Sequence, residues 1–117
     1  MAYTESEISV TLVAGADLRT HQYKFVSVNS SGLVVLTADD GYANGVLMNA
    51  PNTNEPAQVA IAGVVKVACG AAVTRGGTVA SGASGAAKNV DTNSVILGTA
   101  LETGANGRVI SILFHPR

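Results

Sequence analysis

The sequence has few of the residues from which reactive sites are built. It contains one cysteine, two histidines and no tryptophan, and only 4% of its 117 residues are aromatic. A single cysteine excludes an intramolecular disulfide. Charged residues make up 13% of the chain, about half the usual share, and the formal net charge is −1. This balance argues against binding to DNA, RNA or an anionic membrane, because such binding needs a basic patch.

Long apolar runs are also missing. No stretch approaches the roughly 18 consecutive apolar residues of a transmembrane helix. The start, MAYTESEISV, lacks the basic and apolar regions of a secretory signal, so we expect a soluble protein made in the cytoplasm. Hydrophobic residues nevertheless reach 47%. A chain with so few charges and so many apolar residues is expected to bury surface in an oligomer or against a partner.

Apolar residues recur with a period of two, which is typical of β-strands. In ISVTLV, Ile8, Val10 and Leu12 face one way, and the run 57–70 predicts two strands or one long strand bent at Gly63. Turn signals such as NSSG and Asn-Gly separate the runs. The small, polar stretch ASGASGAAKNVDTNS predicts an ordered surface loop or a weak strand.

These patterns predict an all-β fold, a small single-domain β-barrel or β-sandwich with little or no helix. No segment of useful length has the 3.6-residue apolar period of an amphipathic helix. We expect residues 1–7 to form a flexible N-terminal arm and residues 8–117 to form a single β domain. Strand order, and with it the choice between barrel and sandwich, does not follow from alternation.

The glycine-rich stretch GVVKVACGAAVTRGGTV raises the question of catalysis. Cys69 is in phase with Val65 and Val67, which indicates a small buried hydrophobe and not a nucleophile. The motif TRGGTV lacks the Gly-Lys pair and the following helix of a phosphate-binding loop. Its glycines are therefore predicted to form a turn, and Arg75, exposed on that turn, is a candidate partner contact.

The remaining ionisable residues show no recognisable site either. Asp39 and Asp40 are adjacent in DDGYANG, but a calcium loop needs more oxygen ligands at regular spacing, so a solvated turn is expected. One cysteine and two distant histidines lack the spacing of a zinc site. A carrier lysine is not expected, because Lys66 lies within a predicted strand and Lys88 in a predicted loop without the flanking residues of such a site. We predict no enzyme activity, no catalytic residue, no metal site and no cofactor.

Two longer runs are more informative: GVLMNAPNTNEPAQVAIAGVVKVACGAAVTRGGTV and ILGTALETGANGRVISILF. Together they resemble the small capsid cement, or decoration, proteins of tailed bacteriophages, a group long labelled a prophage domain of unknown function. The resemblance covers Leu33 to Phe114 and extends loosely over the residues before them. Its motifs consist of glycines and small apolar residues, so the resemblance rests on the order and spacing of the motifs and not on any single one.

The resemblance implies a homotrimer that binds the outer surface of the expanded icosahedral head at threefold and quasi-threefold sites. It would stabilise the head against internal DNA pressure, after synthesis in the cytoplasm of the host bacterium. The implied partners are the major capsid protein and other copies of the chain, without nucleic acid or membrane. In some cement proteins an N-terminal segment becomes ordered on the capsid. The candidate contacts with the capsid, in addition to Arg75, are therefore Ala2, Tyr3, Thr4 and Glu5. The alternative is a receptor- or carbohydrate-binding module displayed on a virion surface.

Overall fold

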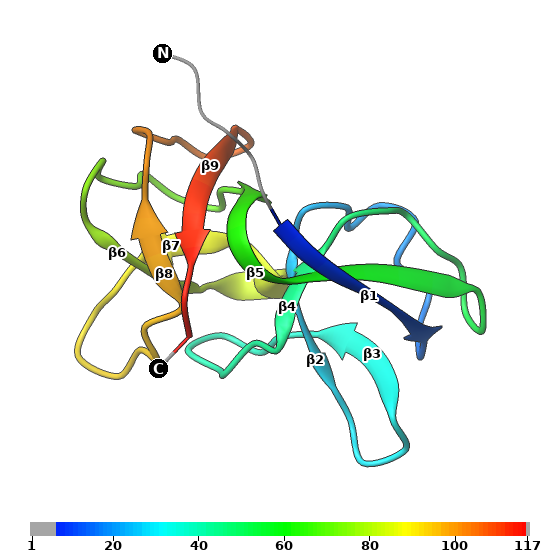
Figure 1. Ribbon diagram of the computed structural model, residues 1–117. Helices are drawn as coiled ribbons and strands as arrows, with labels where there is room; N and C mark the ends of the chain where they lie inside the picture. Colours follow the sequence, from blue (N-terminus) through cyan, green and yellow to red (C-terminus); the bar gives the residue numbers. More distant parts are fainter. Residues whose placement is uncertain (1–6, 117) are drawn as a thin grey trace.

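Nine β-strands form one continuous sheet in the computed structural model, which describes residues 7–116 (Figure 1). The strands are β1 (Glu7–Ala14), β2 (Phe25–Val28), β3 (Leu33–Leu36), β4 (Gly45–Leu47), β5 (Pro56–Ala68), β6 (Thr78–Ser81), β7 (Ala87–Asn89), β8 (Gly98–Ala100) and β9 (Val109–Phe114). A single 3₁₀ turn, Ala83–Gly85, is the one helical element of the described residues. The all-β prediction is therefore confirmed.

The sheet closes into a ring twice, and both rings use β5. In the first ring the order is β1–β3–β2–β4–β5, and β1 pairs with both β3 and β5. In the second ring the order is β5–β9–β8–β6–β7, and a bridge between Cys69 and Ala87 closes it. We call these rings the first unit and the second unit. Figure 1 shows them on either side of β5, which runs through both.

The long strand β5 changes partners at Gly63. Before this residue β5 pairs with β1 and β4, and after it with β9. Gly63 has a φ of 96°, a left-handed conformation that glycine adopts without strain. Of the two alternatives that the sequence left open, the structure has one long strand bent at Gly63.

The two units have the same topology and the same register. The pairs β2–β3, β2–β4 and β4–β5 of the first unit match β6–β7, β6–β8 and β8–β9 of the second. Equivalent residues such as Val26 and Val79 lie 53 positions apart. The parallel bridge between Ala14 and Val34 has its counterpart between Cys69 and Ala87. The chain is thus a tandem of two equivalent five-stranded units, a repeat that the sequence analysis missed.

The two units also share a position at which the backbone of a neighbouring strand leaves room only for glycine. Gly45 begins β4 and Gly98 begins β8. A Cβ atom on Gly45 would lie 2.5 Å from the carbonyl oxygen of Ala60. A Cβ atom on Gly98 would collide with the carbonyl oxygen of Leu113, which is the residue equivalent to Ala60. At both positions only glycine allows the neighbouring strand to approach this closely.

Each unit encloses its own core, and the second core also takes side chains from the first unit. The first core consists of Ala14, Leu18, Val26, Val34, Leu47, Ala57 and Val59. The second core includes Ile110, Ile112 and Phe114 of β9, whose predicted shared face is confirmed as buried. Phe25 joins this second core from the first unit, and its ring centroid lies 6.2 Å from that of Phe114.

Other predictions fall on single elements. The hairpin at NSSG is present, because the side chain of Asn29 accepts hydrogen bonds from the backbone N–H groups of Ser31 and Leu33. The weak strand expected within residues 80–94 is β7. Lys88 belongs to β7, however, so its predicted place in a loop was wrong, since β7 pairs with β6 and is too short to show alternation.

Candidate functional site

The predicted contact residues are only partly within the described chain. Ala2, Tyr3, Thr4 and Glu5 lie outside the described residues. Arg75 is exposed in the turn 74–77, where the N–H of Gly77 donates to the carbonyl oxygen of Thr74 at 3.0 Å. The predicted turn at TRGG is therefore confirmed, and the role of Arg75 in binding a partner stays a prediction.

Cys69 is buried in the second core, as its phase with Val65 and Val67 predicted. Burial raises the pKa of its thiol, and the weaker influence of the Arg108 charge acts in the opposite direction. A thiol with a raised pKa is a poor nucleophile because little thiolate is present near neutral pH. The interpretation of Cys69 as a small buried hydrophobe is confirmed.

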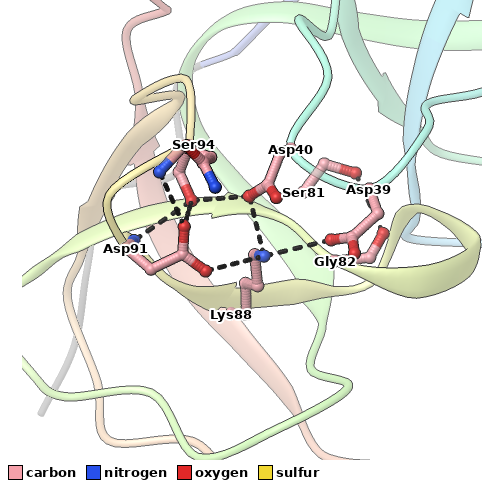
Figure 2. Close-up of polar contacts among 8 residues, drawn as sticks. Asp39, Asp40, Ser81, Gly82, Lys88, Asp91 and Ser94 are labelled. Carbon is pink, nitrogen blue, oxygen red and sulfur yellow. Dashed lines mark hydrogen bonds and ion pairs between the residues drawn. The ribbon is translucent and has the colours of Figure 1, made fainter.

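The most prominent polar feature is an ion-pair cluster around Lys88 (Figure 2). The Lys88 Nζ atom lies 3.0 Å from Asp39 Oδ1, 2.7 Å from Asp40 Oδ1 and 3.2 Å from Asp91 Oδ2. The Ser94 hydroxyl oxygen lies 2.7 Å from Asp40 Oδ1 and 2.9 Å from Asp91 Oδ1. Because Asp39 and Asp40 precede β4 in the first unit, the cluster joins the two units away from β5.

The electrostatics of this cluster hold Lys88 as a cation. Hydrogen bonds from Lys88 to Asp40 and then Asp39 raise the pKa of the lysine, and the same bond to Asp40 lowers the pKa of that carboxyl. The backbone N–H of Asn93 lowers the pKa of Asp91, with further contributions from Ser94 and Lys88. The turn predicted at Asp39 and Asp40 is present. The Asp39 side chain is exposed in it, whereas the Asp40 side chain is partly buried beside Lys88.

The hollow beside the cluster is small. It has a volume of 210 Å³ and is lined mainly by small residues, together with Asp39 and Lys88. This volume is below the roughly 300–1,000 Å³ of a small-molecule pocket. No group of three or more His, Cys, Asp or Glu side chains within residues 7–116 is arranged to hold a metal ion. We interpret the cluster as a clamp between the units.

Several large apolar side chains are exposed on the surface. Exposed large hydrophobic side chains are spread over β1, β2, β5 and β9 and the loop before β4. They are Ile8, Val10, Val13, Val28, Tyr42, Ile61, Val109 and Leu113. On the face of β1 that the sequence predicted, Ile8 and Val10 are exposed, whereas Leu12 packs against the first core. No helix that could span a bilayer occurs among residues 7–116.

Comparison with known proteins finds a similar fold among solved structures. No protein-family model matches the sequence. No curated protein matches it either. Among solved structures, the chain is similar to the N base of head fiber gp8.5 in bacteriophage phi29, with a TM-score of 0.74 and 19% sequence identity. The match covers 94% of this chain and 95% of the phage protein chain. The chain therefore shares its fold, over nearly its whole length, with the base of a bacteriophage head fiber.

Proposed function

We propose that this chain is a structural protein of a bacteriophage virion. More specifically, it is a decoration protein that binds the outer surface of the expanded head, as a homotrimer at threefold and quasi-threefold sites. The observation that carries the proposal is the fold shared with the phi29 head fiber base. The sequence resemblance to phage decoration proteins supports it independently, because it rests on motif order and not on coordinates.

The surface chemistry supports a role in assembly. With 13% charged residues, the chain has few groups that keep apolar surface in water. Its exposed Ile, Val and Leu side chains lie on strands, which form rigid docking surfaces. Burial of such side chains against protein partners is favourable in proportion to the apolar area removed from water.

The mechanism of stabilisation would be linkage. A protein that binds only the expanded lattice stabilises that lattice by its free energy of binding, as any ligand stabilises the state it prefers. A trimer that contacts several capsid subunits gains avidity, because its second and third contacts form at high effective concentration. The major capsid protein is thus the proposed partner, and the proposal needs neither cofactor nor catalysis.

The proposed capsid contacts are the N-terminal residues and the turn at Arg75. Deletion of residues 2–5 and, separately, Arg75→Ala should each weaken binding to heads. Both changes should leave the oligomeric state of the free protein unaltered, because neither replaces or removes a residue of the strands β1–β9. Equal head binding by the deletion variant and the full chain would remove the N-terminal residues from the proposal.

The direct test is co-sedimentation with phage heads that lack the protein. The candidate phage is found by locating the gene beside a major capsid gene. We expect saturable binding to expanded heads, at a fixed ratio to capsid subunits, and no binding to unexpanded heads. Absence of binding to both forms would refute the decoration role. The alternative, a carbohydrate-binding module, would then be tested on a glycan array, where Tyr42, the exposed aromatic residue of the described chain, would be the first residue to substitute.

A further inference from the structure

In the tandem, the first unit packs against the second through one outer face, which we call its wall. The equivalent wall of the second unit, and the end of the first unit that such a wall would cover, have no partner within the described chain. Within the chain, the wall of the first unit covers one end of the ring of strands of the second unit, which we call the open end. The wall residues of the first unit are Phe25, Val46 and Ala60, all fully buried in the second core. The equivalent wall of the second unit consists of Thr78, Thr99 and Leu113. None of these three is buried, and Leu113 is 42% exposed.

The open end of the second unit is covered, whereas that of the first unit is exposed. Val65 and Phe114 line the open end of the second unit, where 1% and 3% of their surfaces are exposed. Their equivalents in the first unit, Val10 and Ile61, are 36% and 38% exposed. Val28 is likewise exposed in the first unit, whereas its equivalent, Ser81, is buried in the second. The first unit therefore has an apolar open end that nothing in the described chain covers.

We propose that a second copy of this chain covers it. The wall of the second unit, Thr78, Thr99 and Leu113, docks into the open end of the first unit of the next copy, lined by Val10, Val28 and Ile61. This contact between copies repeats the contact between units within one chain. The inference deepens the proposed function, on which it rests for the number of copies.

Continuity with the internal contact selects a second copy as the occupant. The two walls share strand order and register, so the second unit presents its wall in the backbone shape that already fits an open end. The side chains have changed in a compensating way. The large wall residue Phe25 is replaced by Thr78 on β6, but Ala60 is replaced by Leu113 on β9, which restores apolar bulk on the far side of β8.

Charge also favours this head-to-tail arrangement. Residues 7–62 contain five acidic and two basic side chains, whereas residues 63–116 contain two acidic and four basic side chains. A contact between the second unit of one copy and the first unit of the next therefore brings together halves of opposite net charge. A head-to-head contact would bring together halves of like charge. Because the contact is heterologous, it produces a ring only if the rotation between copies closes.

Cross-linking of engineered cysteines tests the contact without phage heads. Ile61 and Thr78 are the equivalents of Phe114 and Phe25, whose ring centroids are 6.2 Å apart within the chain. The double variant Ile61→Cys/Thr78→Cys, treated with a short bismaleimide, should give a ladder of products that ends at the trimer. The native Cys69 is buried and should not react. Each single variant alone should remain monomeric on a denaturing gel, and a mixture of the two should stop at dimers.

The oligomeric state of charged variants provides the second readout. Leu113→Asp and Val28→Asp each place a charge in the contact and should reduce the mass in solution threefold, to that of the monomer. Val109→Asp is the matched control, because Val109 is 43% exposed on the same strand as Leu113. Its equivalent, Pro56, stays exposed and outside the internal contact, so this variant should keep the wild-type mass.

The outcomes separate this inference from the proposed function. A wild-type chain that remains monomeric at the highest attainable concentration, with no cross-linking of the double variant, would overturn the inference and assign the open end to a different protein. Cross-linking of a single variant with itself would also overturn it, because that result requires a head-to-head contact. A ladder that continues beyond three copies supports the contact and contradicts the proposed trimer. A trimer that fails to bind heads contradicts the proposed function alone.

Discussion

Phe25 is the residue whose removal should most clearly reveal how the two units are joined. It begins β2 in the first unit, yet its ring is fully buried in the second core against Phe114. Truncation of a buried phenylalanine to alanine costs about 3–5 kcal/mol, because apolar burial is lost and a cavity remains. At about 4 °C or more per kcal/mol for a domain of this size, Phe25→Ala should lower Tm by about 12 °C or more.

The repeat supplies the control for this prediction. Thr78 is equivalent to Phe25 but is only half-buried, so Thr78→Ala should cost about 1 kcal/mol or less. Thermal unfolding and urea unfolding, each followed by far-ultraviolet circular dichroism at one fixed protein concentration, measure the Tm and the free energy of unfolding of both variants. Phe25→Leu provides a milder change if the alanine variant does not fold. Equal losses of stability for Phe25→Ala and Thr78→Ala would refute the claim that the wall of the first unit completes the core of the second.

Three further predictions concern single sites. Gly98→Ala should lower the free energy of unfolding by about 1–3 kcal/mol in urea titrations, because the new methyl group collides with a backbone oxygen; an unchanged midpoint would contradict this. Lys88→Met should destabilise the protein near neutral pH, and the difference from wild type should shrink in acid. Lys88 lowers the pKa of Asp40 below its usual 3.8, so this stabilisation is complete above that value and is lost as the pH falls through the lower value of the folded state; a difference independent of pH would count against the clamp. Cys69 should react with a thiol reagent only at the rate at which the fold opens, and a native rate as fast as the denatured one would show that it is accessible.

The elements governed by local patterns could be predicted from the sequence. Alternation placed Cys69 inside with Val65 and Val67, because a strand with one buried face repeats every two residues. Glycine at position 63 suggested the bend in β5, and the turn at TRGG followed from its two glycines. In each case the determining residues lie within a few positions of the feature that they determine.

The clamp and the strand order could not be predicted, because they depend on residues far apart in the chain. Lys88 and Asp39 are separated by 49 positions, and no local pattern signals their contact. Neither residue is part of a recognisable motif, so only the fold brings them together. The partial burial of Asp40 beside Lys88 was therefore not predicted.

The repeat is weakly visible in the sequence, at glycines that occupy equivalent positions in the two halves. The glycine pairs Gly15 and Gly70, and Gly45 and Gly98, occupy equivalent positions at offsets of 55 and 53 residues. The change in offset, together with replacements such as Phe25 by Thr78, obscures the similarity of the two halves. Comparison of the sequence with itself at these offsets would have indicated two similar units.

Cryo-electron microscopy of expanded heads incubated with the purified protein tests the account most directly. The account predicts added density on the outer surface at threefold and quasi-threefold sites. There, three copies should form a ring in which Thr78 of each copy faces Ile61 of the next. Heads without added density, or density for isolated single copies, would contradict it.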